Sequence, residues 1–274
     1  MIDLEDFSED IIGKAMRGLE ISVADLSVRS GVDQGHIKNL LNGNFEEACA
    51  RAISPRLKLC ADALVASGNS LWRPQAVDLD GLEIFNTPWR NMRVNAFLIW
   101  DPASGEAAAF DTGADAVGMI DLVKKKELKV GAVYLTHTHG DHIADLDRVL
   151  SAFADPPVYV SEHEPLRGAI SIPEGHCRRI GALSLETRLT RGHSRGGHTY
   201  VVTDLARPVA IVGDALFAGS MGGGMVSYTE ALETNRQQIF TLEDNTVVCP
   251  GHGPMSSVGE EKQHNPFYPE FKTN

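Results

Sequence analysis

The sequence predicts an α/β fold preceded by a small all-α segment, and two patterns along the chain support this prediction. Up to about residue 75, apolar residues recur at helical spacing and strand-like runs are scarce. After Gly81, short β-branched apolar runs alternate with longer amphipathic stretches, as they do in α/β proteins. We therefore expect a helical domain over residues 1–75 and an α/β domain over residues 76–274.

The helical domain contains four helical stretches in the sequence pattern. They are IIGKAMRGLE, SVADLSVRSGV and DQGHIKNLLNG, followed by residues 55–66. Ser22 and Asp33 are suitable N-caps, because their side-chain oxygens can accept from the free N–H groups of a first helical turn. Gly31 and Gly43 suit turns or helix ends.

The α/β domain is expected to alternate strands with helices. The predicted strands are residues 94–100, 107–110, 130–135, 158–161, 201–203, 209–212 and 246–249. The predicted helices are residues 115–127, 143–153, 164–168 and 229–242. Residues that can bind a metal follow several of these strands.

The segment HTHGDH at residues 137–142 is the most informative motif. It directly follows an apolar strand, so His137 and His139 point to the same side of the chain. Asp141 and His142 lie in the turn that leads to the next helix. Imidazole and carboxylate groups are metal ligands, so this segment alone can serve two adjacent metal ions.

Three further residues occur where an apolar run meets a glycine-containing turn: His193 in LTRGHSRGG, Asp214 in VAIVGDALF and His252 in VVCPGHGP. At such positions a rigid sheet can hold a ligand beside a loop. His198 competes with His193, but we expect it behind the ligands because it opens the strand HTYVVT. Surface or capping positions are expected for the histidines without partners at ligand spacing, which are His36, His163, His176 and His264.

In this order, these residues resemble the metallo-β-lactamase superfamily, and specifically its glyoxalase II-like branch, over roughly residues 81–254. The resemblance implies an αβ/βα sandwich with a catalytic domain at residues 76–274. It also implies two metal sites, with His137, His139 and His193 on the first ion, Asp141, His142 and His252 on the second, and Asp214 bridging both. Asp111 in AAAFDTG matches the family's first motif and is expected to orient the site by hydrogen bonding. An Asx turn before Gly113 is the alternative interpretation of Asp111.

The implied activity is hydrolysis. Two divalent ions about 3.5–4 Å apart lower the pKa of a bound water from 15.7 to about neutrality, so metal-bound hydroxide can attack a small ester, thioester or lactone carbonyl. Asp141 and Asp214 are the candidate catalytic residues of the metal-dependent hydrolase. The nitrogen and oxygen donors fit zinc, and they also admit iron or manganese.

The substrate is a small molecule that the sequence does not specify. Glyoxalase II binds glutathione with a long C-terminal helical extension, whereas 274 − 252 = 22 residues follow His252 here. Arg195 and Tyr228 are candidate substrate-binding residues, on loops near His193 and after Asp214. A solvated Arg195 and a Tyr228 packed on the sandwich are the alternatives.

Two other functions remain open. The first is a persulfide dioxygenase-like enzyme with one iron, although the loop GSMGGG lacks the arginine and aspartate of such enzymes. The second is a DNA-binding regulator with a ligand-sensing metal site, because VADLSVRSGVDQGHIKNLLNG resembles a phage-repressor helix-turn-helix with residues 34–41 as recognition helix. Residues 1–75 carry 8 Lys/Arg and 11 Asp/Glu, a charge of 8 − 11 = −3, which disfavours phosphate contacts. Packing or dimerisation is the favoured role of the helical domain.

Composition places the chain in the cytoplasm without a membrane segment. Apolar runs stay short of the ~18 residues that span a bilayer, and the acidic N-terminus MIDLEDFSEDIIG differs from a secretory signal. The four cysteines have no CxxC spacing and are expected to be free thiols. A net charge of −12 argues against a broad nucleic-acid surface.

Overall fold

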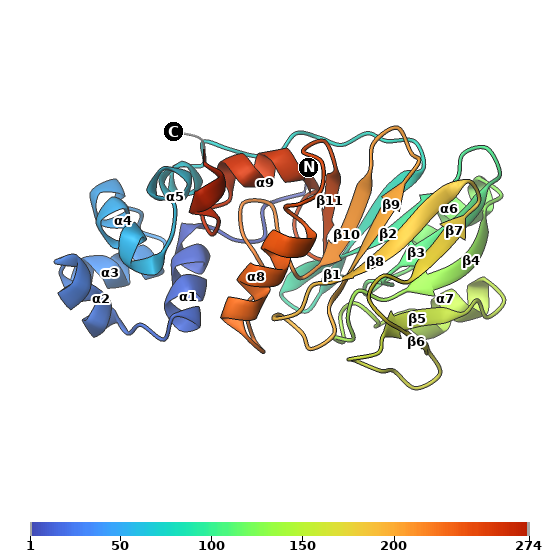
Figure 1. Ribbon diagram of the computed structural model, residues 1–274, viewed down its shortest axis with the longest axis horizontal. Coiled ribbons are helices and arrows are strands. Elements are labelled where there is room, and N and C mark those ends of the chain that lie inside the picture. The colour runs from blue at the N-terminus through green and yellow to red at the C-terminus, as the bar shows by residue number, and fades with distance from the viewer. Residues whose placement is uncertain (1, 273–274) are drawn as a thin grey trace.

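The computed structural model describes residues 2–272 and arranges their strands in two six-stranded sheets that pack face to face (Figure 1). Helices cover the outer side of each sheet, and a cluster of short helices from the N-terminal part lies beyond one end of the sandwich. The predicted α/β sandwich with an N-terminal helical segment is therefore confirmed. None of the helices in residues 2–272 combines the length and the apolar character needed to cross a membrane.

The first sheet contains the N-terminal half of the strands in chain order. They are β1 (Leu82–Trp89), β2 (Met92–Trp100), β3 (Glu106–Phe110), β4 (Lys129–Tyr134), β5 (Val158–Ser161) and β6 (Ile170–Ile172). β1, β2 and β3 pair antiparallel, and β3 to β6 pair parallel. Because β3 and β4 run parallel, the loops after them, which carry Asp111 and His137, meet at one edge.

The second sheet has the strand order β12 (Ser256–Ser257), β11 (Val247–Pro250), β10 (Val209–Gly213), β9 (His198–Thr203), β8 (Leu183–Leu189) and β7 (Cys177–Ile180). β10 and β11 pair parallel and the other neighbours pair antiparallel. Asp214 and His252 follow the carboxyl ends of the parallel pair, so these two residues also share an edge.

Alternation along the strands produces the core. In β2 and β3, Phe97 and Phe110 point between the sheets, where they meet Tyr200 and Ile211 from the second sheet. The opposite faces of the first sheet's strands pack on α6 (Val117–Lys125) and α7 (Leu146–Ala152). Each such fully buried side chain stabilises the fold by about 1.5–3 kcal/mol, so both faces of this sheet hold the site rigidly.

The outer face of the second sheet shares one hydrophobic cluster with the N-terminal helices. From the sandwich this cluster includes Val212, Leu216 and Tyr228, and from the N-terminal part it includes Ile12 and Leu26. The sandwich helices are α8 (Tyr228–Gln238), α9 (Val258–His264) and η2 (Pro269–Phe271). The N-terminal ones are α1 (Ser8–Gly18), α2 (Val23–Ser30), α3 (Gln34–Leu41), α4 (Glu47–Ile53), η1 (Ser54–Leu57) and α5 (Ala61–Gly68).

Local capping in the helical segment follows the prediction. The Ser22 hydroxyl accepts from the Asp25 N–H at 3.1 Å, and the Asp33 carboxylate accepts from the Gly35 N–H at 2.7 Å. Gly31 ends α2 with φ 76°, a left-handed conformation that glycine adopts without steric cost.

Two predicted helices are wrong. Residues 164–168 form turns, because Pro165 interrupts a helix and Gly168 has φ 88°. Residues 55–66 form η1 and α5 rather than one helix, because Lys58 has φ 56° and breaks the stretch. The sequence pattern does not predict strands β1, β6, β7, β8 and β12 or helices α4, α9 and η2.

Candidate metal centre

The predicted ligands converge from four loops at one edge of the sandwich. The HTHGDH segment follows β4, His193 lies between β8 and β9, Asp214 follows β10 and His252 follows β11. The structure brings them together as two groups whose ligand atoms all lie within 4.8 Å of one another. One group is His137, His139, His193 and Asp214, and the other is Asp141, His142 and His252.

Three imidazole nitrogens meet in the first group. His139 Nδ1 lies 3.0 Å from His137 Nε2 and 3.0 Å from His193 Nε2. The Nδ1 atoms of His137 and His193 are occupied by other partners, the Thr136 hydroxyl and the Gly223 carbonyl, each at 3.0 Å. Their Nε2 atoms therefore present lone pairs toward His139, an arrangement that suits a cation.

Asp214 lies between the two groups. Its Oδ1 is 3.3 Å from His142 Nε2, whereas its Oδ2 is 3.3 Å from His193 Nε2 and 3.4 Å from His252 Nε2. Asp141 Oδ2 completes the second group at 3.4 Å from His252 Nε2. Oδ2 of Asp214 thus faces one histidine of each group, and Oδ1 faces the second group.

The ligands are oriented by hydrogen bonds from behind. Asp111 Oδ2 accepts from His142 Nδ1 at 2.8 Å and from the Thr136 hydroxyl at 2.7 Å, and its Oδ1 accepts from the Thr136 N–H at 2.7 Å. Asp111 has φ 54°, so its backbone is held in a left-handed conformation at this point. It therefore lies beside His142 and the strand end that carries His137.

Two further side chains fix the ligand loops, and the sequence analysis assigned neither to the site. Glu164 accepts from the Thr138 N–H and hydroxyl at 2.9 and 2.6 Å, and from the Gly196 N–H at 3.0 Å. It therefore joins the HTHGDH loop to the loop that follows His193. Asn95, fully buried, donates to the carbonyls of Pro250 and Gly253 at 2.8 Å each and so holds the His252 loop.

Charge in the site is balanced between carboxylates and histidines. Burial opposes ionisation of Asp214, but His252, His142 and His193 outweigh it and hold the pKa of Asp214 well below its ordinary value. Burial also disfavours the charged form of His142, yet Asp111 and Asp214 raise its pKa to about 10. The carboxylates thus draw positive charge to the second group.

The donor set fits bound cations. Within residues 2–272, His142 Nε2 and Asp214 Oδ1 are buried with no hydrogen-bond partner, and leaving such atoms unpaired costs about 1–3 kcal/mol each. A cation between them would use both lone pairs. Gly251 also leaves room beside these two atoms, because a Cβ at this position would lie 2.1 Å from Asp214 Oδ1 and 2.6 Å from His142 Cε1.

His198 supports this site through its backbone rather than its side chain. Its N–H donates to the Thr136 carbonyl at 2.8 Å, directly before His137. Its imidazole is fully buried, has no hydrogen-bond partner among the described residues and packs edge-on to Tyr200. Burial lowers the pKa of His198 to about 4. The His198 backbone therefore lies behind the ligands, but among the described residues its imidazole makes no hydrogen bond to any of them.

The two candidate substrate residues lie in different surroundings. Tyr228 is not aimed at the site, because its ring is buried against Gly18 of α1 and Phe267, in the cluster shared with the helical segment. A side chain at Gly18 would overlap this ring, with a Cβ 2.1 Å from it. Arg195 is exposed on the loop after His193.

The N-terminal segment contacts the loop that follows Asp214. Lys14 of α1 forms an ion pair with Asp6 and donates to the Met221 carbonyl at 2.8 Å, and the Ser220 hydroxyl donates to Asp6 at 2.6 Å. Residues 215–222 are buried as a result. The loop that follows Asp214 is therefore firmly packed at its start.

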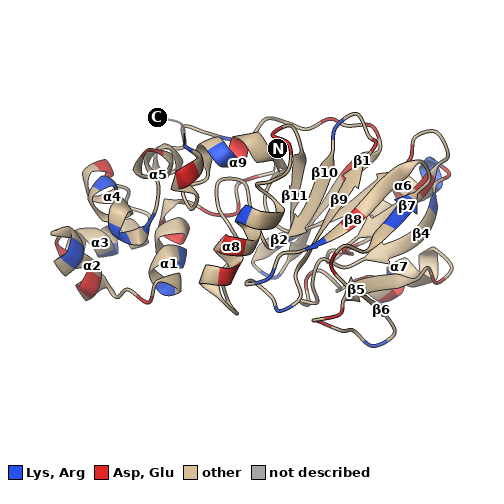
Figure 2. Cartoon of the chain, in the orientation of Figure 1, with Lys and Arg blue, Asp and Glu red and all other residues tan. Residues whose placement is uncertain are grey.

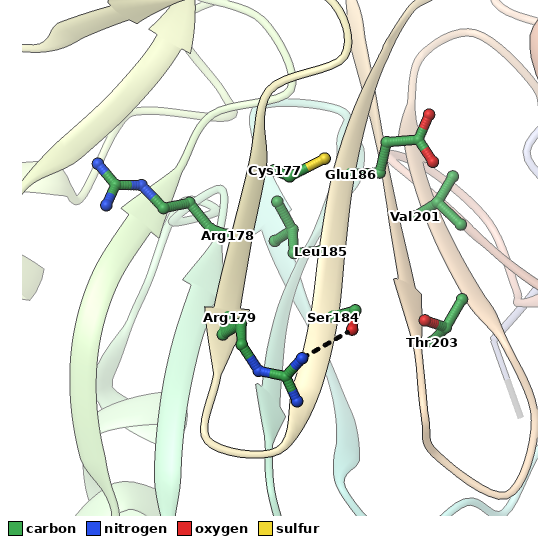
Figure 3. A pocket seen from close by; sticks show the side chains of 8 residues that line it. All are labelled: Cys177, Arg178, Arg179, Ser184, Leu185, Glu186, Val201 and Thr203. Carbon is green, nitrogen blue, oxygen red and sulfur yellow. Dashed lines mark hydrogen bonds between the residues drawn. The ribbon is translucent and has the colours of Figure 1, made fainter.

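A cavity of about 370 Å³ lies elsewhere, on strands β7, β8 and β9 (Figure 3). It is lined by side chains such as Cys177, Arg179, Glu186 and Thr203, and Arg179 donates to the Ser184 hydroxyl at 3.4 Å. None of the metal-centre residues lines it. We therefore do not associate this cavity with the ligand cluster.

Known proteins similar to this chain match the same region. The model of the metallo-beta-lactamase superfamily matches residues 89–169. The probable metallo-hydrolase YqgX of Bacillus subtilis is 34% identical over 67% of this chain and 98% of YqgX. The hydroxyacylglutathione hydrolase GloC of Haemophilus influenzae is 25% identical over 63% of this chain and 92% of GloC. The crystal structure of TTHA1623 in a di-iron-bound form has a TM-score of 0.56 and 25% identity, over 67% of this chain and 99% of that one.

These matches agree with the fold and with the ligand cluster. The superfamily match contains the HTHGDH segment, and YqgX is covered over nearly its whole length. Superfamily members bind divalent metals, and the two groups of His and Asp residues provide the donors for them here. The chain belongs to the metallo-beta-lactamase superfamily.

Proposed function

We propose that this protein is a dinuclear metal-dependent hydrolase of small esters, thioesters or lactones in the glyoxalase II-like branch. The position of Asp214 carries the proposal, because its carboxylate lies within 3.4 Å of histidines from both ligand groups. A carboxylate can bridge two cations in this way, whereas a neutral imidazole with one lone pair cannot. The similarity to GloC, a hydroxyacylglutathione hydrolase, supports a thioester among the candidate substrates.

His137, His139, His193 and Asp214 would hold one ion, and Asp141, His142, His252 and Asp214 would hold the other. Bound divalent ions supply a water whose pKa is near neutrality, and they polarise a carbonyl oxygen. The chain's own contribution is orientation. Asp111 fixes the His142 ring, Gly223 fixes His193 and the Arg93 carbonyl accepts from His252 Nδ1 at 2.5 Å.

Zinc is our first choice for the metal, because all seven donors are imidazole or carboxylate groups. The same donors accept iron or manganese, and TTHA1623 crystallised with two irons. Elemental analysis of the purified full chain should find at least two ions per chain. An activity panel with an ester, a thioester, a lactone and a β-lactam then identifies the carbonyl class.

The outcome of this experiment separates the alternatives. At least two ions per chain with carbonyl hydrolysis would support the proposal. One iron per chain, oxygen consumption with a persulfide and no hydrolysis would replace it with the dioxygenase. Hydrolysis that is lost on chelation and restored by zinc would attribute the activity to the metal centre rather than to a contaminant.

For the helical segment we propose a packing role inside a cytoplasmic enzyme, with dimerisation as a second use. Gln34, Lys38 and Asn39 are exposed on α3, as a recognition helix would require, but Lys/Arg and Asp/Glu are mixed over these helices (Figure 2). Lys14 is already paired with Asp6. DNA binding that weakens steeply with salt would contradict this role and favour a regulator.

A further inference from the structure

A second cluster of metal-capable side chains lies in the helical segment. His36 of α3, Glu46 at the N-cap of α4 and Cys49 in the first turn of α4 place one ligand atom each within 4.8 Å of the other two. They are 10 and 3 residues apart in sequence, so no motif marks them. The loop between α3 and α4 brings them together.

The Glu46 carboxylate already makes hydrogen bonds with the His36 ring and the Cys49 thiol, and a metal ion could replace the shared hydrogen atoms. His36 Nδ1 lies 2.8 Å from Glu46 Oε2. The Cys49 thiol is hydrogen-bonded to the same carboxylate, which, with burial, raises the pKa of the thiol. Glu46 makes no capping hydrogen bond to α4, so its carboxylate has no other structural task in this turn.

The environment suits a cation that is partly exposed. The side chains of His36 and Glu46 are 53% and 48% exposed, so they can adjust, whereas Cys49 is 8% exposed and fixed by the core. Ligands about 2.0–2.3 Å from a tetrahedral zinc lie roughly 3.3–3.7 Å apart. His36 and Glu46, at 2.8 Å, would therefore separate slightly to hold the ion. Water completes such a three-ligand site.

We infer that His36, Glu46 and Cys49 form a zinc site distinct from the candidate catalytic centre. The thiolate selects a borderline-soft ion such as zinc over magnesium or calcium. Binding releases the thiol proton to solvent and involves no redox change. The ion would join α3 to the start of α4, so it would rigidify this helical segment. This inference does not depend on the proposed hydrolase activity.

Cobalt substitution tests the site with a signal of its own. A thiolate bound to Co²⁺ gives a near-ultraviolet charge-transfer band, and the catalytic cluster contains no cysteine. Full-length protein stripped of metal and titrated with Co²⁺ should show the band. Cys49→Ser should abolish it and lower the cobalt content by about one ion per chain. His36→Ala should weaken cobalt binding at this site while leaving the core intact.

Matched variants decide between this cluster and other sources of the band. Cys60→Ser and Cys177→Ser remove the partly buried and the exposed thiol and should leave the band unchanged. Asp214→Ala should remove metal from the catalytic cluster and keep the band, so failure of the two proposals can be told apart. If Cys49→Ser misfolds, His36→Ala and Glu46→Gln still test the site from the surface. Absence of the band at saturating cobalt, or a band that survives these substitutions, would overturn the inference.

Discussion

Asp214 is the residue at which the two ligand groups meet, and its contacts decide what its loss should do. Three histidine nitrogens lie within 3.4 Å of its oxygens, and its side chain is 8% exposed. Its removal leaves imidazoles that repel one another when protonated, with Asp111 and Asp141 as the remaining carboxylates beside them. The residue sits after β10 rather than inside the strand, so the sheet itself does not need it.

We therefore expect Asp214→Ala to lose the second metal and most hydrolytic activity while the fold persists. Removing one partner of a buried charged network costs about 3–5 kcal/mol, part of which returns because the histidines can become neutral. Metal content by elemental analysis and circular dichroism would be measured beside Asp121→Ala, an exposed aspartate on α6. Normal metal content in purified Asp214→Ala would refute its bridging assignment.

His193 and His198 differ in where their rings point. His193 Nε2 lies 3.0 Å from His139 Nδ1, whereas the His198 ring contacts Tyr200 in the core and contributes only its backbone N–H near the site. His193→Ala should abolish stoichiometric metal binding. His198→Ala keeps the backbone contact and should weaken metal affinity by at most about 10–100-fold. Metal titration of both variants checks this order, and the reverse order would move the ligand by five residues.

At the scale of the elements, Glu164 shows how one side chain holds two ligand loops. Its carboxylate accepts from Thr138 beside the first histidines and from Gly196 beyond His193. These hydrogen bonds lower the pKa of Glu164 despite its partial burial, so it is ionised at neutral pH. Charge-assisted hydrogen bonds of this kind are about twice as strong as neutral ones.

Glu164→Ala should release metal to a chelator faster than the wild type and lower metal affinity by about 10–100-fold, because the loops lose their common acceptor. Glu164→Gln keeps one acceptor oxygen and should lie between the two. The exposed neighbour Glu162 provides the control Glu162→Ala. Equal release rates for the Glu162 and Glu164 variants would assign Glu164 a merely structural role in the turn.

The sequence indicates the candidate ligands because each follows an apolar run that local pattern identifies, and the structure brings these residues together. The sequence does not predict contacts between residues that lie far apart along the chain. Glu164 meets Thr138 across 26 residues, and Lys14 meets Met221 across 207. The sequence makes Tyr228 a candidate substrate residue because its packing partner Gly18 lies far away along the chain. β7, with the sequence CRRI and three exposed residues, lacks the apolar alternation that identifies a strand.

At the scale of the whole molecule, the division at residues 75 and 76 remains a prediction that truncation tests. Sequence alone suggests that residues 76–274 fold by themselves, since every ligand lies between His137 and His252. The shared cluster changes this expectation, because removing α1 exposes Tyr228, Leu216 and the loop held by Lys14. We expect the truncated chain to melt at lower temperature and to bind a hydrophobic dye. A truncation as stable and metal-loaded as the full chain would establish independent domains.

The ligands also come from both sheets, and this has a mechanical consequence. The HTHGDH loop belongs to the first sheet, while His193, Asp214 and His252 belong to the second. Ions bound between these residues would connect the two sheets. They would stabilise the folded state by about 4.1 kcal/mol when the free metal concentration exceeds the Kd a thousandfold. Amide hydrogen exchange should then quicken on chelation at the ends of β4, β10 and β11 together. Exchange that quickens in one sheet alone would mean that bound ions do not connect the two sheets.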